Sequence, residues 1–346
     1  MDMDMDKVYF APWNMNGDML ERSKALYESA GTFDVVSPGD KVAIKLHAGE
    51  LGNPNYVRPF FLKHIVDKVR ALGGKPFLMD TTTYYPLKRN NAVDHMETAV
   101  ANGFGFAPFI VADGLMSENG ESMPSPDPLL SDVEVAGAVN EADAMIVVSH
   151  LKGHPLSGFG GAIKNVGMGC VTKKTKLEQH RLLDLVLHEE HCQGCGVCVE
   201  ACWFDLPRLE GDVAVIDSPN CMRCPICSSS CPEGAITLEG QYKILHGVSV
   251  ATKGVIDTFD PGKVSYVNFA NDVSTVCDCA PVQGDKYIKD VGIFASSSPL
   301  SIDAAGLEHI EYEHLNQVHG VDCFEQLTKM EELGVAGSKN PSVEKV

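Results

Sequence analysis

Residues 192–232 read CQGCGVCVEACWFDLPRLEGDVAVIDSPNCMRCPICSSSCP and contain eight of the twelve cysteines of the chain. The cysteines form two runs with the same spacing, C-x2-C-x2-C-x3-C, and each cysteine of the second run lies 29 residues after its counterpart. This spacing is typical of two [4Fe–4S] clusters, where the fourth cysteine of each run ligates the other cluster. We therefore expect one cluster on Cys192, Cys195, Cys198 and Cys231, and the other on Cys221, Cys224, Cys227 and Cys202.

The segment resembles a bacterial two-cluster ferredoxin domain over roughly residues 186–240. One difference is Trp203, which follows Cys202 where the ferredoxin pattern has proline, and it affects the local turn rather than the ligands. The alternative is a pair of structural zinc sites on the same cysteines. Zinc sites favour paired C-x2-C hooks over a triple run with a distant fourth cysteine, so we favour iron–sulfur clusters.

Composition limits the class of protein. The 346 residues suggest about two domains, and 44% hydrophobic with 22% charged residues is ordinary for a globular protein. A net charge of −19 argues against a nucleic-acid partner, because a phosphate backbone would be repelled. The N-terminal MDMDMDKVYFAPW lacks a signal-peptide pattern, and no apolar run is long enough to cross a membrane. Clustered thiols indicate a reducing compartment, so we expect a cytoplasmic protein without a membrane partner.

The flanks of the cysteine region alternate short apolar runs with amphipathic stretches, which is typical of βαβ units. The segment 117–130 is expected to be a loop that could cover a site, and the tail after Glu332 to fray. The predicted fold is α/β, a mostly parallel sheet domain built from residues 1–185 and 241–346, with a small α+β ferredoxin-like domain inserted at 186–240. The predicted strands span 8–11, 42–47, 77–80, 109–112, 144–150, 264–269 and 291–295, and the helices span 18–30, 56–72, 93–102, 131–141, 244–259 and 299–309.

Polar residues follow several of the predicted strands. In open α/β sheets, ligands bind beyond the carboxyl ends of the strands, so these side chains are expected to meet in one polar pocket if the strands are parallel. The residues at these ends are His47, Asp80, His150 and the segment Asn271-Asp272 that leads to Cys277 and Cys279. Taken singly, Glu50 is expected to be a solvated loop carboxylate and Asp80 could cap a turn.

The stretch SHLKGHPLSGFGGAIKN, residues 149–165, directly follows a predicted strand. Lys152 and Lys164, together with backbone amides around Gly158, Gly160 and Gly161, are expected to bind an anion, with Asn165 in the same binding site. The glycines fit neither the phosphate-loop nor the dinucleotide pattern. His47, His150 and His154 are candidates for proton transfer or for binding a metal.

Cys277 and Cys279 leave several interpretations open: two inert thiols, soft-metal ligands, a redox pair, or contacts to a substrate. We expect them to line the reacting face of the pocket. Cys170 and Cys323 are expected to be structural. His180, His188 and His191 are expected to lie on a helix that leads into the cysteine region, as surface or packing residues.

Longer strings carry a second resemblance. VAIKLHAGELGN, NNAVDH, VVSHLKGHPLSGFGGAIKNVGMGC and the late CDC followed by DVGIFASSSPLSIDAA resemble the iron–sulfur family known as domain of unknown function 362. The resemblance spans nearly the whole chain and implies an α/β domain with a two-cluster ferredoxin segment at this place. It implies no substrate. The serines of Ser296–Ser301 replace a usual acidic version of that string, so a carboxylate role there is open.

Three functions are compatible with these features. The first is an oxidoreductase in which two [4Fe–4S] clusters pass electrons to a small anionic substrate or cofactor, with an additional metal or a flavin as a further possibility. The second is a non-enzymatic electron-transfer or assembly factor acting on a protein partner. The third is a binding module whose clusters are structural. The first two require a low-potential electron donor or acceptor protein.

Overall fold

The computed structural model describes residues 5–217 and 219–346. The first four residues of the N-terminal stretch MDMDMDKVYFAPW therefore lie outside the described part. An eight-stranded sheet forms its centre, in the order β16-β1-β15-β14-β7-β2-β3-β4. Neighbours among β14, β7, β2, β3 and β4 run parallel, whereas β15 is antiparallel to both β14 and β1. The predicted α/β fold with a mostly parallel sheet is therefore confirmed. The strands are β1 (Lys7–Pro12), β2 (Lys41–Lys45), β3 (Lys75–Asp80), β4 (Phe109–Val111), β7 (Ala144–His150), β14 (Val264–Ala270), β15 (Gly292–Ser296) and β16 (Ser342–Lys345).

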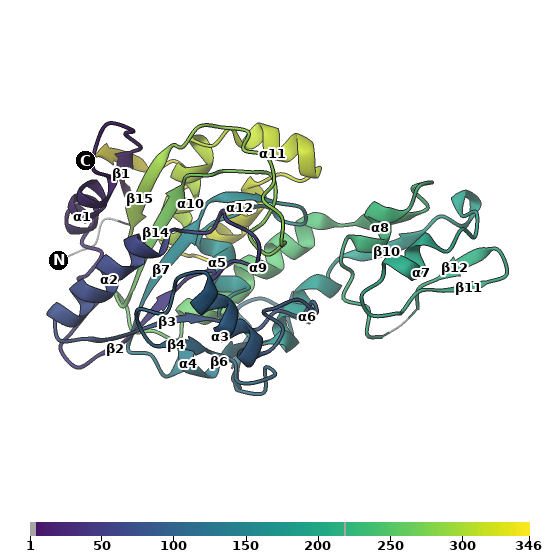
Figure 1. Cartoon of the computed structure of the whole chain (residues 1–346), viewed down its shortest axis with the longest axis horizontal. Helices are drawn as coiled ribbons and strands as arrows, with labels where there is room; N and C mark the ends of the chain where they lie inside the picture. The colour runs from purple at the N-terminus through teal and green to yellow at the C-terminus, as the bar shows by residue number, and fades with distance from the viewer. Residues whose placement is uncertain (1–4, 218) are drawn as a thin grey trace.

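Helices cover both faces of the sheet, and the alternation of side chains along each strand divides the core in two (Figure 1). Val42 and Ile44 of β2 pack with the helices of one face, whereas Ala43 packs with those of the other. Every residue of the central strand β7 is buried. The first face carries α1 (Met19–Ser29), α2 (Pro59–Ala71) and α3 (Ala92–Ala101), and the second carries α5 (Ala162–Gly167), α9 (Gln241–Ile256), α10 (Pro299–Glu308), α11 (Tyr312–His319) and α12 (Phe324–Glu332).

Three local predictions are wrong. Residues 131–141 do not form one helix, but strand β6 (Asp132–Ala136) followed by the short helix α4 (Gly137–Asn140). The alternating side chains of β6 bury Val133 and Val135 while the strand pairs with β5 (Gly120–Pro124), which lies in the segment predicted to be a loop. The tail does not fray, because β16 pairs in parallel with β1. Each of these strands depends on a partner that local sequence does not reveal.

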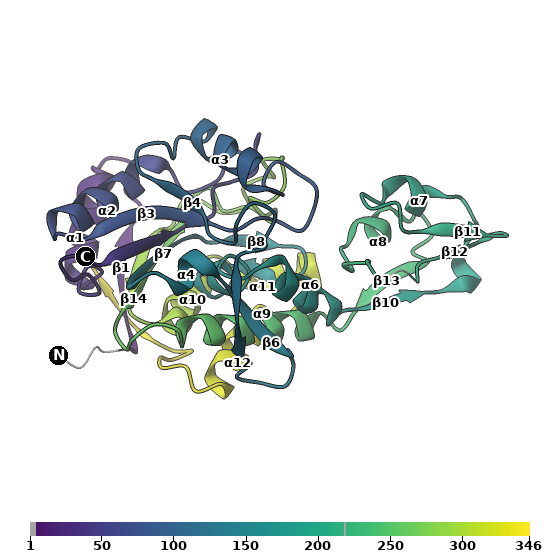
Figure 2. The same cartoon turned by 90° about the horizontal axis from the view of Figure 1, so that it is seen from below.

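The cysteine-rich segment projects to one side of the α/β body, as Figures 1 and 2 show. Strands β10 (Asp184–Leu187) and β13 (Ile236–Glu239) pair antiparallel at its base, where α6 (Lys173–Arg181) leads in and α9 leads out. A small separate core includes Cys198, Ala214, Cys227 and Ile236. The remaining elements of the projection are the 3-10 turn η1 (Glu189–His191), α7 (Val197–Ala201), β11 (Arg208–Glu210), β12 (Val213–Val215) and α8 (Ile226–Ser230).

Hydrogen bonds and aromatic contacts hold this projection against the body, among them the pair Phe204 and Tyr84, whose ring centres lie 5.9 Å apart. The guanidinium of Arg223 donates hydrogen bonds to the backbone carbonyls of Arg181 (2.6 Å) and Leu183. The ring of Trp203 lies 6.2 Å from that of Tyr85, between ring centres. Within the described part of the chain, no helix is long and apolar enough to span a membrane.

Candidate functional site

A cavity of about 380 Å³ lies at the carboxyl ends of the parallel strands. The predicted convergence of strand ends is observed there, because residues that follow β2, β3, β7 and β14 line one space. The projecting segment closes one side of it with Trp203, Met222, Cys224, Pro225 and Ile226. The cavity is therefore bounded by both parts of the protein. The residues of the α/β body that line the cavity include His47, Asp80, His150, Lys152, His154, Lys164, Cys277 and Cys279.

Asp80, at the end of β3, is the centre of a buried ion network. Its carboxylate lies 3.0 Å from Nζ of Lys45 and 3.4 Å from Nη1 of Arg89, and all three side chains are almost inaccessible to solvent. Burial favours the neutral acid, but the charge of Lys45 and the neighbouring ring of His95, whose Nε2 lies 3.6 Å away, hold the pKa of Asp80 well below its usual range. Asp80 also accepts a hydrogen bond from the amide of Thr81, as a turn cap would. Its main role is nevertheless to pair the two buried cations.

Glu50 extends this network and corrects the prediction of a solvated carboxylate. Its side chain is buried and accepts hydrogen bonds from Nε of Arg89 (3.3 Å) and from the backbone amide of Lys88 (3.0 Å). Arg89 also donates to the hydroxyl of Tyr85, at 2.6 Å. The guanidinium thus fixes the loop that follows β3 against the loop that follows β2, and this positions Tyr85 at the cavity.

His150 and Lys152 flank a second buried carboxylate, that of Asp278. Nδ1 of His150 lies 2.9 Å from Asp278 Oδ1, and its Nε2 lies 2.7 Å from the carbonyl oxygen of Asn271. The ring of His150 thus bridges the carboxylate of Asp278 and the backbone at Asn271. Nζ of Lys152 lies 3.0 Å from Asp278 Oδ2. Burial opposes ionisation, but the charges of His150 and Lys152 lower the pKa of Asp278 to about 2.

The glycine-rich turn holds an anion of its own chain, which differs from the anion site predicted there. The first amides of α5, those of Ala162 and Ile163, donate to the carboxylate of Asp303 at 2.7 and 2.8 Å. Gly161 allows this approach, because an added Cβ would lie 2.4 Å from Oδ1 of Asp303. Gly158 and Gly160 belong to β9 (Gly158–Gly160), which pairs with β8 (Lys152–His154). The start of α5 is therefore already neutralised.

Asn165 and Lys164 have different roles although they are adjacent. The amide of Asn165 accepts a hydrogen bond from Nζ of Lys45 (2.6 Å) and donates to the carbonyl of Val148 (3.0 Å), so it joins β2 to β7. Lys164 lines the cavity, and its Nζ makes no hydrogen bond or ion pair with the described residues. Both Lys152 and Lys164 lie over Gly160, where an added Cβ would be 3.5 Å and 3.6 Å from their side chains. Lys164 is thus the cation available to a ligand.

His154, Cys277 and Cys279 form the tightest group of potential metal ligands in the described chain, with one ligand atom from each within 4.8 Å of the others. Nδ1 of His154 accepts hydrogen bonds from the amides of Leu156 and Ser157, both at 3.2 Å. Burial, followed by the charge of Lys164, lowers the pKa of His154 to about 4, so the ring is neutral and carries its proton on Nε2.

Cys277 and Cys279 form a thiolate–thiol pair. The backbone amide of Cys279 donates to Sγ of Cys277 at 3.3 Å. A side-chain hydrogen bond from Cys279 lowers the pKa of Cys277 well below its usual value, against the effect of burial and with help from His154 and Lys164. The same hydrogen bond raises the pKa of Cys279. Cys277 therefore faces the cavity as the more nucleophilic sulfur.

Alkylation of Cys277 by iodoacetamide is expected to slow less between pH 9 and pH 7 than alkylation of an ordinary thiol, because a lowered pKa keeps a larger share of the sulfur ionised. An unperturbed thiol would slow roughly tenfold per pH unit below its pKa. Removing the donor with Cys279→Ala should restore that pH dependence. Mass spectrometry of tryptic peptide 264–286, whose cysteines are Cys277 and Cys279, measures the rate. A tenfold drop between pH 8 and pH 7 in the unmodified protein would contradict the lowered pKa.

Two further residues were missed or misassigned from sequence. His180, expected to be a surface or packing residue, lines the cavity, and its buried Nδ1 has no hydrogen-bond partner in the described structure. The predicted helix carries His180 but not His188 or His191, because α6 ends at Arg181 and strand β10 follows it. Burial lowers the pKa of His180 to about 3. Lys176 also lines the cavity and donates to the hydroxyl of Thr81 (2.7 Å), and burial lowers its pKa to about 8. Their spacing on α6, four residues apart, places both on one helix face and was the available signal.

His47 lies where the sequence predicted, after β2 at the cavity. Its Nδ1 accepts a hydrogen bond from the amide of Gly49 at 3.1 Å. Burial, followed by the charges of Arg89 and Lys152, lowers the pKa of His47 well below its usual value. The ring is neutral near pH 7 and presents an N–H rather than a positive charge.

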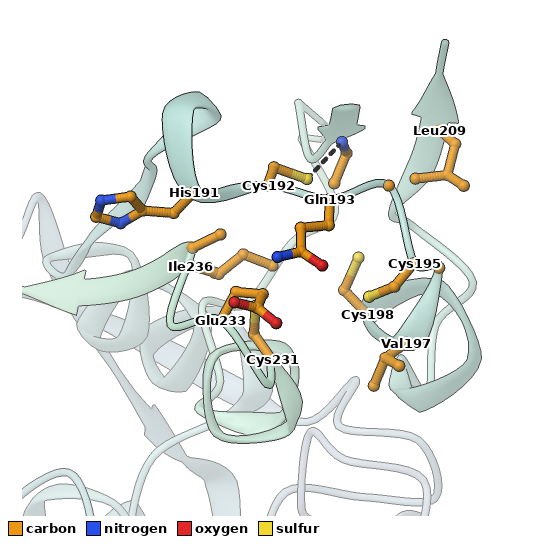
Figure 3. Close-up of a pocket in the computed structure, with 14 residues that line it drawn as sticks. His191, Cys192, Gln193, Cys195, Val197, Cys198, Leu209, Cys231, Glu233 and Ile236 are labelled. Atoms are coloured by element: carbon orange, nitrogen blue, oxygen red, sulfur yellow. Dashed lines mark hydrogen bonds between the residues drawn. The ribbon is translucent and has the colours of Figure 1, made fainter. Parts of the chain in front are cut away.

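The cysteines of the projection fall into two spatial sets. Cys192, Cys195, Cys198 and Cys231 line a small cavity, which they reach from the segment around α7 and from the end of α8 (Figure 3). Gly194 and Gly196, both with positive φ, turn the first segment around it. In the second set, burial and the neighbouring Cys224, Cys221 and Cys202 raise the pKa of Cys227 to about 12. Thiols that disfavour one another's ionisation fit a cationic metal centre, which removes that repulsion.

Backbone amides point at several of these sulfurs. The amide of Ala214 donates to Sγ of Cys192, and the amide of Arg223 donates to Sγ of Cys221, both at 3.4 Å. Of the two sets, the second contributes Cys224 to the wall of the large cavity, whereas Cys195 of the first is exposed. The set that contains Cys224 is called the near set below, because it reaches the cavity. The set that contains Cys195 is called the far set.

The family model described as domain of unknown function (DUF362) matches residues 42–308. No curated protein matches the chain. The lactate racemase apoprotein from Thermoanaerobacterium thermosaccharolyticum is similar in structure, with 13% identity and a TM-score of 0.42 over 92% of this chain and 59% of that one. A protein from Thermotoga maritima is similar with 12% identity and a TM-score of 0.43, over 89% of this chain and 60% of that one. The chain thus spans about 60% of the length of these two structures.

Proposed function

The chain belongs to the family described as domain of unknown function (DUF362), and we propose that it is an iron–sulfur oxidoreductase acting on a small anionic substrate or cofactor. One observation carries the proposal: a single cavity is lined by Cys224 of the cysteine-rich projection and by the ionisable groups at the strand ends. Concave pockets with a few convergent polar groups and perturbed pKa values are typical of active sites.

The spacing and the spatial sets of the eight cysteines support two [4Fe–4S] clusters. We assign one to Cys192, Cys195, Cys198 and Cys231 and the other to Cys221, Cys224, Cys227 and Cys202, within a ferredoxin-like domain at 186–240. When bound, such clusters supply single electrons. The remaining steps belong to side chains of the body.

Charge at the cavity supports an anionic ligand. In a chain of net charge −19, the described wall carries Lys45, Arg89, Lys152, Lys164 and Lys176, against Asp80 as its carboxylate. Lys45, Arg89 and Lys152 are neutralised by buried carboxylates. Lys176 donates hydrogen bonds to the hydroxyl of Thr81 and the carbonyl of Thr82, which leaves Lys164 as the wall cation with no hydrogen bond or ion pair among the described residues. The neutral rings of His47 and His154 can donate N–H hydrogen bonds to it. The thiolate of Cys277 then faces the bound group.

The exposed far set of cysteines supports a partner. A protein that donates or accepts low-potential electrons can approach Cys195 without entering the cavity. Eight thiols reserved for metal require a reducing environment, and on that ground we propose the cytoplasm. Flavin binding and an additional metal stay open alternatives for the cavity.

Metal analysis of anaerobically purified protein tests the proposal. The expected result is about eight iron and eight acid-labile sulfide per chain, with electron paramagnetic resonance signals of two interacting [4Fe–4S] centres after reduction. Zinc in place of iron would overturn it. Clusters that never change oxidation state with dithionite would make them structural and would also overturn it. If the purified chain binds a protein partner but no small anion, the alternative of an electron-transfer or assembly factor is favoured instead.

A further inference from the structure

We propose that Cys277 and Cys279 form a reversible disulfide in the wall of the cavity and act there as a two-electron redox pair. The inference deepens the proposed function, on which its electron source rests. Within the described chain, Cys277 and Cys279 are the only cysteines outside the projection that line this cavity.

The backbone allows the bond. The amide of Ala280 donates to the carbonyl of Cys277 at 3.1 Å, so residues 277–280 form a tight turn. A turn folds the chain so that residues two apart approach to within the roughly 4.4–6.8 Å between Cα atoms that a disulfide needs. The two sulfurs already lie within 4.8 Å of each other. Closing the disulfide requires rotation of two side chains rather than movement of a strand.

The neighbouring histidine favours sulfur chemistry over metal binding. A metal-bound histidine usually donates its second N–H to a carbonyl or carboxylate. Nδ1 of His154 instead accepts from two amides, so the nitrogen that remains carries the proton. That N–H can stabilise a thiolate but offers no lone pair to a metal. Lys164, which makes no other ion pair with the described residues, adds a positive charge at the same sulfurs.

The proposed reaction is reduction of the Cys277–Cys279 disulfide by an iron–sulfur electron carrier. Two electrons from one-electron carriers of the iron–sulfur class break the sulfur–sulfur bond, and one proton is taken up. The products are the thiolate of Cys277 and the thiol of Cys279. In the reverse direction, the pair gives two electrons to an oxidised substrate and loses that proton as the bond forms again. Two single-electron centres match one disulfide in electron number.

Thiol mapping tests the pair directly. Anaerobic full-length protein is equilibrated with a series of oxidised and reduced dithiothreitol mixtures, quenched in acid, alkylated and digested with trypsin. Peptide 264–286 contains Cys277 and Cys279 and no other cysteine, so its mass reports their state. The expected result is a loss of two hydrogen masses and of both alkyl groups, with the two-electron dependence of a single disulfide.

Matched variants separate this pair from other thiols. Cys279→Ser should leave Cys277 alkylated at every mixture, whereas Cys323→Ser, at a buried cysteine outside the cavity lining, should behave as the unmodified protein. The inference is overturned if both thiols of peptide 264–286 are alkylated throughout, or if one equivalent of a metal other than iron is lost in Cys277→Ser. Protein with eight irons and no disulfide refutes this inference alone. A disulfide that cycles in protein without iron refutes the proposed electron source instead.

Discussion

Replacing Cys224 with serine is expected to remove about half of the bound iron and leave the other half in place. Cys224 belongs to the near set of four cysteines, and serine keeps its size while replacing a soft thiolate by a hard oxygen ligand. Cys195→Ser, in the far set, should also lose about half. Iron and sulfide per chain, with electron paramagnetic resonance of the remaining centre, measure both variants after anaerobic purification.

Comparing Cys224→Ser with Cys195→Ser tests the assignment of the cluster ligands more sharply than either variant alone. Because Cys224 lines the large cavity and Cys195 is exposed, the two remaining centres should differ in their access to solvent and hence in spectrum and reduction potential. Cys323→Ser is the control, since its buried sulfur lies outside both sets and its iron content should stay at about eight. Full retention of iron in both cluster variants would refute the assignment of these cysteines.

Sequence predicted the sheet well where strands were apolar and parallel. The run Ala144–His150 is a central strand with every side chain buried, and its apolar residues alone indicate that environment. Strands that form only by pairing with a segment far along the chain were not predicted from the sequence. β16 pairs with β1 across more than 300 residues of chain, and its residues Ser342–Lys345 are exposed and, apart from Val343, polar. No local pattern distinguishes such an edge strand from a loop.

The sequence predicted where the candidate site lies, but not which residues form its ion pairs and hydrogen bonds. His47, His150, His154, Lys152 and Lys164 all reach the cavity that their strand ends implied. Their partners were not predictable, because a partner far along the chain decides whether a group is free. Asp278 engages His150 and Lys152 from 128 and 126 residues away.

Several residues missed by the sequence interpretation are charged groups buried by tertiary contacts. Arg89 lies in a loop whose polar sequence suggests exposure, yet its side chain is 2% exposed and joins two carboxylates. Lys45 ends strand β2 directly after the apolar residues 42–44, and a lysine at a buried strand position was the available clue. A buried charge of this kind needs a partner, and the search for one leads to Asp80.

Substituting Asp80 with alanine is expected to lower the free energy of unfolding by about 3–5 kcal/mol, because Lys45 and Arg89 would lose a buried counter-charge. Asp80→Asn keeps the shape and an acceptor oxygen for the amide of Thr81 but removes the charge, so it should lose part of that stability. Urea unfolding of anaerobic protein at pH 7 measures both. Asp67→Ala, which breaks an exposed ion pair with Lys63 on α2, is the control and should cost no more than about 1 kcal/mol.

The acid dependence of stability separates the charge of Asp80 from its packing. The pKa of Asp80 is lower in the folded protein than in the unfolded chain, so its ionisation stabilises the fold above about pH 4, and that stability is lost as pH falls further. The difference in unfolding free energy between the unmodified protein and Asp80→Asn should therefore shrink between pH 5 and pH 3. A difference that stayed constant over this range would mean that Asp80 contributes shape alone, and that Lys45 and Arg89 are neutralised by other groups such as Glu50.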